Sequence, residues 1–169
     1  MELLLVRHAI AEERDHARYP DDSLRPLTDH GRQRFHRAAR GLATLLDPPE
    51  RVLASPYART WETATILADT AGWPDPEPCE PLAAHHGAET ALTLVEGLGD
   101  PGCVALVGHE PTMTLLGRLL LAEPDRAGVD WFRKGAAALV ACDGPAAPGA
   151  GRLVWMHQPR ALRALADVD

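Results

Sequence analysis

Short apolar runs alternate along this chain with longer segments of helical periodicity, and this alternation limits the possible folds more than any other feature. We expect strands over residues 1–6, 51–54, 103–107, 136–142 and 153–157, and helices over residues 29–47, 56–71, 89–98 and 111–121. The pattern predicts an α/β fold, a three-layer α/β/α sandwich with a mostly parallel central sheet. A loop rich in Gly and Pro joins the last two strands, which are expected to form an antiparallel hairpin at the sheet edge.

The boundaries of the expected helices carry familiar signals. Thr28 is a suitable N-cap for the first helix, which Pro48-Pro49 would stop. Pro56 is expected at the first position of the second helix, and Gly72 at its end. Residues 73–81 contain four prolines and are predicted to be irregular surface chain.

Length and charge exclude several classes of protein. With 169 residues, the chain is expected to form one domain over residues 1–169. The net charge of -7 argues against binding to nucleic acid or to acidic membranes. No apolar run is long enough for a membrane span or a signal peptide, so we expect a cytoplasmic protein. Three scattered cysteines form no metal or redox motif, and no coiled-coil pattern predicts an oligomer, so a monomer is expected.

Polar residues follow three of the predicted strands at the point where each strand ends. Arg7-His8 follows the first, Ser55 to Arg59 the second, and Gly108-His109 a later one. Ligands of parallel α/β sheets bind beyond the carboxyl ends of the strands. We therefore expect these three segments to converge on one pocket.

The cationic residues in these segments favour a phosphate ligand. Of the 17 lysine and arginine residues, only Lys134 is a lysine. The planar guanidinium group of arginine can bind two phosphate oxygens at once, so it suits phosphate better than the ammonium group of lysine. Arg59 would lie in the first turn of its helix, where free backbone N–H groups already favour an anion.

Taken in order, these motifs resemble the histidine phosphatase superfamily, also called the phosphoglycerate-mutase-like family. The resemblance rests on strand-Arg7-His8, Leu27-Thr28-x-x-Gly31, Ser55-Pro56-x-x-Arg59-Thr60 and Gly108-His109. Within this superfamily, the chain is similar to the SixA-type phosphohistidine phosphatase branch in its compact length and in two motifs, Arg25-Pro26-Leu27-Thr28 and Lys134-Gly135-Ala136.

The resemblance implies a mechanism that needs no cofactor. His8 would be the nucleophile and would become a phosphohistidine, while Arg7, Arg59 and His109 would hold the nonbridging oxygens. The arginines are expected to lower the pKa of His8, because a nearby like charge opposes its protonation.

Two positions depart from the family pattern. Ala9 stands where the signature usually has glycine, and we expect the turn to tolerate it. Ala84 stands where mutase and sugar-phosphatase relatives carry a glutamate that serves as proton donor. An alcohol leaving group needs such an acid, whereas an imidazole leaving group needs far less help. The absence of a glutamate at position 84 therefore favours a P–N substrate. Glu80, Glu89 or Glu110 could replace the missing acid, although for Glu110 a role at the start of its helix is preferred.

Further residues are candidates for substrate binding. Ser55 and Gly108 belong to the strand-end motifs, and Arg25 is either a residue of the pocket rim or part of a salt bridge that closes its loop. His85 and His86 are either at the pocket mouth or plain surface residues. A metal site is not expected there, because no carboxylate or cysteine stands at ligand spacing around the pair.

The leading hypothesis is a phosphatase that removes the phosphoryl group from the phosphohistidine of a signalling or phosphotransfer protein. A small-molecule phosphomonoesterase, acting on a sugar, nucleotide or related phosphate, is the alternative among enzymes, and a mutase is less favoured. A phosphoanion-binding module without turnover is the alternative from another class.

Overall fold

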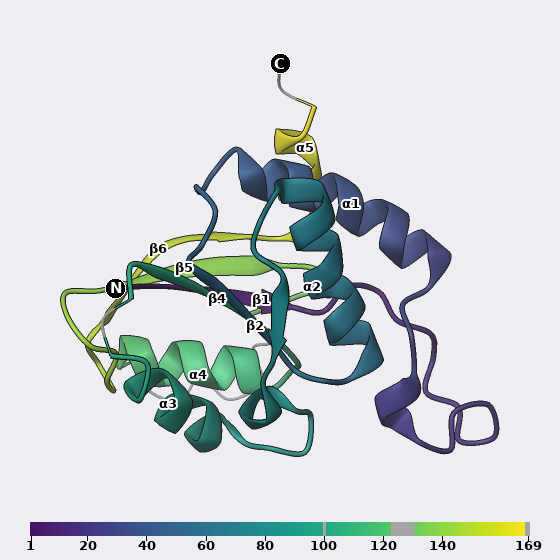
Figure 1. Cartoon of the computed structure of the whole chain (residues 1–169), viewed down its shortest axis with the longest axis horizontal. Helices are drawn as coiled ribbons and strands as arrows, with labels where there is room; N and C mark the ends of the chain where they lie inside the picture. The colour runs from purple at the N-terminus through teal and green to yellow at the C-terminus, as the bar shows by residue number, and fades with distance from the viewer. Residues whose placement is uncertain (100, 123–130, 168–169) are drawn as a thin grey trace.

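Six strands form one sheet in the order β3-β2-β4-β1-β5-β6 in the computed structural model, which describes residues 1–99, 101–122 and 131–167 (Figure 1). The strands are β1 (Glu2–Arg7), β2 (Arg51–Ala54), β3 (Pro76–Pro78), β4 (Cys103–Gly108), β5 (Ala137–Cys142) and β6 (Gly151–His157). The helices are α1 (Asp29–Ala43), α2 (Ala58–Ala71), α3 (Ala88–Glu96), α4 (Thr112–Leu121) and α5 (Pro159–Leu165), with 3-10 turns η1 (Asp22–Leu24) and η2 (Glu80–Leu82). None of the helices in these ranges could cross a membrane.

The register of the parallel strands brings three strand ends to one edge. β1 pairs with β4 so that Arg7 lies opposite Gly108, and β2 pairs with β4 so that Ala54 lies opposite Val107. The backbone N–H of His8 donates to the Gly108 carbonyl at 3.0 Å, which continues the ladder past the end of β1. The predicted convergence of strand ends is therefore confirmed, as is the antiparallel pairing of β5 with β6 at the sheet edge.

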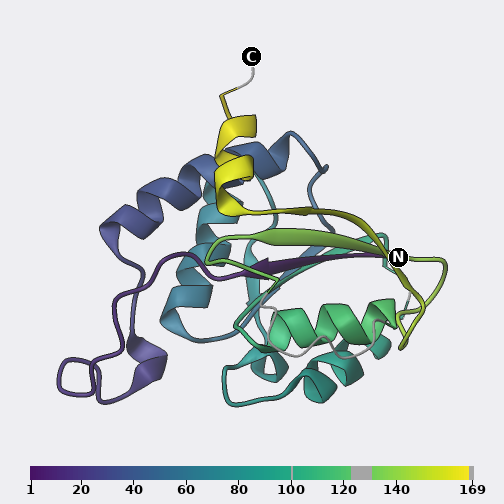
Figure 2. The same ribbon diagram turned by 180° about the vertical axis from the view of Figure 1, so that it is seen from behind.

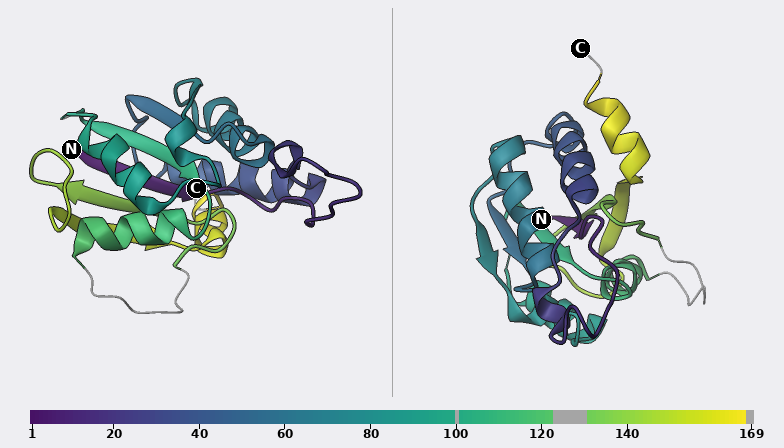
Figure 3. Two further views of the ribbon diagram at one scale, coloured as in Figure 1. Left: turned by 90° about the horizontal axis from the view of Figure 1, so that it is seen from below. Right: turned by 90° about the vertical axis from the view of Figure 1, so that its right-hand side faces the viewer.

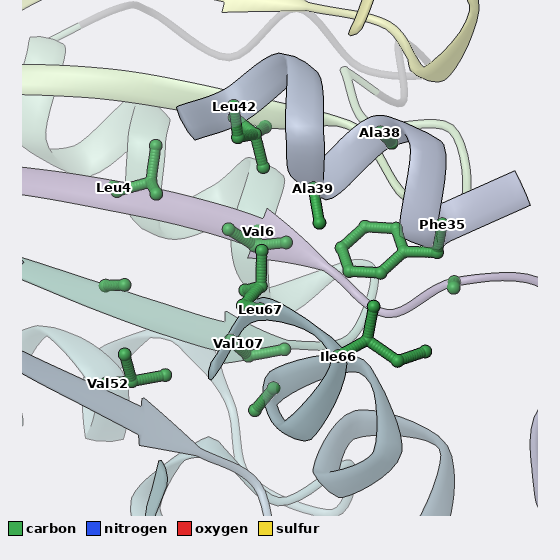
Figure 4. Close-up of a cluster of buried hydrophobic side chains, with 14 of the residues drawn as sticks. Leu4, Val6, Phe35, Ala38, Ala39, Leu42, Val52, Ile66, Leu67 and Val107 are labelled. Atoms are coloured by element: carbon green, nitrogen blue, oxygen red, sulfur yellow. The ribbon is translucent and has the colours of Figure 1, made fainter. Parts of the chain in front are cut away.

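Helices cover both faces of the sheet. Figures 1 and 2 show α1, α2 and α5 on one face and α3 and α4 on the other. Between the sheet and α1 and α2 lies a cluster of buried side chains, shown in Figure 4, that includes Val6, Phe35, Leu42, Leu67 and Val107. A second cluster lies under α3 and α4. The α/β sandwich predicted from the alternation of strands and helices is thus confirmed.

Residues 11–27 extend away from the sheet beyond the end of β1 (Figures 1 and 3). An antiparallel bridge between Ala11 and Leu27 closes this loop at its base. As predicted, Thr28 caps α1, and its hydroxyl oxygen accepts a hydrogen bond from the Gly31 N–H at 2.9 Å.

The expected ends of the first two helices are wrong in detail. Helix α1 ends at Ala43, before Pro48-Pro49, where the Thr44 hydroxyl donates to the Gly41 carbonyl at 2.8 Å. Helix α2 begins at Ala58 and not at Pro56, because the Ser55 N–H still donates to the sheet at Val107 and Tyr57 is extended. Gly72 does end α2, in the left-handed conformation.

The prediction of irregular surface chain over residues 73–81 is also wrong. Pro76–Pro78 pairs with β2 as the edge strand β3, and Trp73 is 5% exposed. Proline is tolerated on an edge strand, because an N–H group that would face solvent is not missed there. Helix α5, which the sequence reasoning did not anticipate, follows β6 and packs on α1.

Candidate active site

The strand ends and the loop after β1 enclose a cavity of about 400 Å³. Its lining residues are Arg7, His8, Glu12, Glu13, Arg14, Arg25, Arg59, Ala84, His109, Glu110 and Lys134. The structure therefore brings together all four residues predicted to be catalytic, from β1, from α2 and from the end of β4.

His8 is held as a neutral imidazole in one tautomer. Its Nδ1 lies 2.7 Å from the carbonyl oxygen of Ala9, which can only accept, so Nδ1 carries the proton and Nε2 keeps its lone pair. The pKa of His8 is lowered to about 3, mainly by burial and further by the charges of Arg59 and Arg7. The expected effect of the arginines has the right direction, although burial is the larger cause.

His109 lies beside His8, with 5.3 Å between the ring centroids. Its Nε2 is 2.8 Å from the Ser55 hydroxyl oxygen, which also accepts from the Tyr57 N–H at 3.4 Å. We assign the Ser55 hydroxyl as donor to Nε2, which places the His109 proton on Nδ1. Burial, and then the nearby His8 and Arg59, lower the pKa of His109, so this imidazole is neutral too.

Asp22 of η1 organises the arginines. Its carboxylate accepts from Arg25 Nε at 2.8 Å and lies 3.0 Å from Arg59 Nη2, while its carbonyl accepts from Arg59 Nη1 at 2.8 Å. The guanidinium groups hold the pKa of Asp22 below its usual range, against the opposing effect of burial. Arg25 thus fulfils both proposed roles: it lines the cavity and forms the salt bridge within its loop.

Three buried nitrogens of the cavity residues have no hydrogen-bond partner in the described part of the chain. They are Arg7 Nε, Arg59 Nε and His109 Nδ1. Buried donors are normally paired. Three unpaired donors on residues that line one cavity therefore suit an anion with several acceptor oxygens.

Thr63 and Tyr57 support the site, and the sequence reasoning did not single them out. The Thr63 hydroxyl accepts from the Ala9 N–H at 3.0 Å and donates to the Arg59 carbonyl at 2.6 Å, so it joins the loop after β1 to α2. The Tyr57 ring packs against His109 and lies 5.0 Å from the Arg59 guanidinium carbon. Thr63 lies one helical turn after Arg59 in the sequence, and this spacing could have identified it as a residue that supports the site.

Ser55 and Gly108 do not line the cavity. Ser55 is fully buried and contacts His109, so the structure gives it a supporting position behind that imidazole. Gly108 packs closely on α4: a Cβ atom there would lie 2.6 Å from Met113 Cε, so the end of that side chain would have to shift.

His85 and His86 lie outside the cavity lining, where Glu80 joins them. The Nε2 atoms of His85 and His86 are 3.3 and 3.9 Å from Glu80 Oε1, and one ligand atom of each residue lies within 4.8 Å of the others. The premise that no carboxylate accompanies the pair is wrong, because η2 turns Glu80 back towards it. These three residues are the ones that could hold a metal ion in the ranges that the structure covers.

The cavity has no carboxylate at position 84, because Ala84 itself lines it. Of the alternative acids, Glu110 lines the cavity and accepts from the Thr114 hydroxyl at 2.9 Å, whereas Glu80 and Glu89 do not line it. Ala9 is tolerated as expected: in the described ranges Ala122 is the only residue other than glycine with a positive φ.

Glu12, Glu13, Arg14 and Lys134 also line the cavity, although they were not predicted as site residues. Lys134 belongs to a motif that carried the resemblance. The other three come from the loop of residues 11–27, whose path beside the cavity has no local sequence signal.

The chain is similar in sequence to known proteins. Residues 3–83 match the histidine phosphatase superfamily (branch 1). An uncharacterized protein of Picosynechococcus sp. is 36% identical over 115 residues, which are 67% of this chain and 68% of that protein.

Solved structures resemble the chain over nearly its whole length. The protein histidine phosphatase SixA, solved with tungstate, is 25% identical, with a TM-score of 0.80 over 96% of this chain and 99% of that one. A mycobacterial glucosyl-3-phosphoglycerate phosphatase, solved with inorganic phosphate, shares the fold at 17% identity, with a TM-score of 0.71 over 94% and 98% of the two chains. The chain belongs to the histidine phosphatase superfamily.

Proposed function

We propose that this protein hydrolyses the phosphohistidine of a signalling or phosphotransfer protein through a covalent intermediate on His8. The observation that carries the proposal is the neutral His8 imidazole in a cavity with three unpaired buried donors. A nucleophile needs a lone pair, and a phosphoryl group in transfer needs donors for its oxygens.

In the first step, His8 Nε2 attacks phosphorus and the P–N bond to the substrate histidine breaks. The electron pair of that bond goes to the leaving imidazole, which a proton on its other ring nitrogen makes a better leaving group. Arg7, Arg59 and His109 donate to the nonbridging oxygens during the transfer. Each charge-assisted contact contributes about 1.5–3 kcal/mol.

In the second step, water attacks phosphorus and the P–N bond to His8 breaks. Inorganic phosphate leaves, the water proton is released, and His8 returns to its neutral form. The hydrogen bond from Nδ1 to the Ala9 carbonyl holds the ring in the same tautomer for both steps.

The choice of a P–N substrate rests on position 84. A methyl group lines the cavity where relatives acting on phosphate esters are expected to carry their proton donor. General acid catalysis is worth roughly 10²- to 10⁴-fold for a poor leaving group. The likeness to the protein histidine phosphatase SixA supports the same choice.

A small-molecule phosphomonoesterase is the second candidate, and one observation favours it. Glu110 lines the same cavity, so its carboxyl group is placed to protonate an alcohol leaving group. On that account the protein would release phosphate from a sugar or nucleotide ester.

A substrate panel separates the two candidates. The unaltered protein and the His8→Ala variant are each offered a phosphohistidine-bearing phosphotransfer protein and a set of sugar and nucleotide monophosphates, and released phosphate is measured. We expect hydrolysis of the phosphohistidine protein at least 100-fold faster than of any ester, in keeping with the range for a missing acid.

The His8→Ala variant is expected to be inactive on every substrate in the panel. Release of phosphate from esters alone would overturn the protein substrate in favour of the phosphomonoesterase. Binding of the phosphoprotein without any release by the unaltered chain would leave only a phosphoanion-binding module.

A further inference from the structure

A second hollow, of about 410 Å³, lies next to the catalytic cavity. Its lining residues are Ala9, Ile10, Gly31, Arg34, Phe35, Ala38, Arg133, Lys134, Gly135, Gln158, Pro159, Arg160 and Arg163. Lys134 lines both cavities, and Ala9 directly follows His8 in the chain. We call this hollow the basic groove.

The cationic side chains of the basic groove form no ion pair with the residues that the structure describes. Five cationic side chains line it: Arg34, Arg133, Lys134, Arg160 and Arg163. No acidic side chain lines it, and the ion pairs found in the described ranges involve none of the five. Burial, and then its neighbours Arg34, Arg37 and Arg160, lower the pKa of Arg163.

This clustering runs against the charge of the whole chain. The protein carries a net charge of -7, and several arginines elsewhere are paired, for example Arg51 with Glu77 and Arg32 with Glu62. An unpaired basic cluster on an acidic protein attracts a complementary negative surface and speeds its diffusional encounter.

The shape of the groove favours a broad ligand over a small one. Arg133, Lys134 and Arg160 are exposed, so their charges lie at the rim, while Phe35 and Ala38 form part of an apolar floor. A site for a small anion buries its donors, whereas a protein interface combines an apolar centre with a charged rim.

We infer that the basic groove is the docking surface for an acidic segment of the substrate protein next to its phosphohistidine. This inference rests on the proposed function, because the segment must lie within reach of His8. Docking there would hold the phosphohistidine over the catalytic cavity. Lys134, which lines both the groove and the cavity, would contact the acidic segment where the segment enters the cavity.

Three synthetic phosphohistidine peptides test the inference. They are identical except that the residues flanking the phosphohistidine are all Glu, all Gln or all Lys. With the unaltered protein, kcat/KM is expected to be at least 10-fold higher for the Glu peptide than for the Lys peptide at low salt, and the ratio should shrink as salt rises. Because each ratio compares two peptides with the same protein, a general loss of activity in a variant does not change the ratio.

A charge reversal and a matched control locate the effect. In the Arg133→Glu/Arg160→Glu variant, the ratio of Glu to Lys peptide is expected to fall to about 1 or below, with the change in KM. The Arg40→Glu/Arg152→Glu variant changes the net charge equally at exposed positions outside the groove, and it should keep the ratio of the unaltered protein. Circular dichroism checks that both variants are folded.

The outcomes separate this inference from the proposed function. Hydrolysis of all three peptides at similar rates, or equal loss of preference in both variants, overturns the docking surface and leaves the function standing. No hydrolysis of any peptide overturns both. A ratio near 1, together with pyrophosphate binding that only the Arg133→Glu/Arg160→Glu variant loses, assigns the groove to a small anion instead.

Discussion

The two imidazoles of the cavity owe their tautomers to different hydrogen-bond partners. His8 is fixed by a backbone carbonyl, which is an acceptor in every state of the protein. His109 is fixed by the Ser55 hydroxyl, which can donate or accept. The state of His109 therefore depends on a side chain, and it can be changed by a single substitution.

We expect Ser55→Ala to lower kcat by roughly 10-fold or more with little change in KM, because His109 loses the partner that keeps its proton on Nδ1. Steady-state kinetics gives this split. Nitrogen NMR of the His109 ring provides the distinguishing readout: the unaltered protein should show a protonated Nδ1, and the variant a mixture of tautomers. An unchanged ring signal would contradict the positioning role.

Ala84→Glu should create activity towards alkyl phosphates. A carboxyl group at this point of the cavity lining would protonate the leaving oxygen, so we expect a gain of about 100-fold on glycerol phosphate. The rate with p-nitrophenyl phosphate, whose leaving group needs no acid, should change little. Ala84→Gln serves as the control of similar size, and a similar gain with Gln would show that the acid is not responsible.

The sequence predicted which side chains meet at the strand ends, but not most of the side chains that hold them in place. Arg7, His8 and His109 lie at the ends of parallel strands, and Arg59 lies in the first turn of the helix that follows β2, so the sheet and this helix bring the four together. Asp22 reaches Arg59 only because the loop of residues 11–27 brings η1 against α2, and nothing local to its sequence encodes that path. Ser55 was predicted to bind substrate, but it lies behind His109.

At the scale of elements, the order of the sheet explains the site. β1 and β4 are far apart in the chain but are neighbours in the sheet, and they end at the same level. Their ends therefore place His8 and His109 side by side. Hydrophobic runs and turn residues predicted most elements. They failed for β3, where two prolines masked an edge strand, and for α5, which is too short to show a clear period.

Gly41→Ala should loosen the contact between α1 and α5. A Cβ atom at position 41 would lie 1.8 Å from the Leu162 carbonyl oxygen, which is backbone and cannot rotate away. We expect a loss of about 1–3 kcal/mol in the free energy of unfolding, measured with denaturant. Gly144→Ala, where a Cβ meets nothing within 4 Å, should be nearly neutral. Equal effects at the two positions would contradict the close packing of α1 on α5.

For the whole molecule, the buried neutral histidines make stability depend on pH. Unfolded His8 takes up a proton near pH 6.5, whereas folded His8 does so only near its pKa of about 3. The unfolded state therefore binds more protons between these values, so the stability present above pH 6.5 falls as the pH falls.

The pH dependence of unfolding tests this burial. Between pH 6.5 and about 4, we expect the unfolding free energy of the unaltered protein to fall more steeply than that of the His8→Asn variant. The difference in slope should reach up to about 1.4 kcal/mol per pH unit. Denaturant unfolding at each pH gives the two curves. Parallel curves for the unaltered protein and the variant would mean that folded His8 titrates as an ordinary exposed imidazole.

The most direct test of the account is to locate the phosphoryl group in the middle of a turnover. The protein is mixed with a phosphohistidine peptide, quenched within milliseconds at alkaline pH, digested and sequenced by mass spectrometry. We predict a phosphoryl group on His8 alone, on Nε2, and none in the His8→Asn variant. Turnover with a phosphoryl group on another residue, or with none on the protein, would contradict the covalent mechanism.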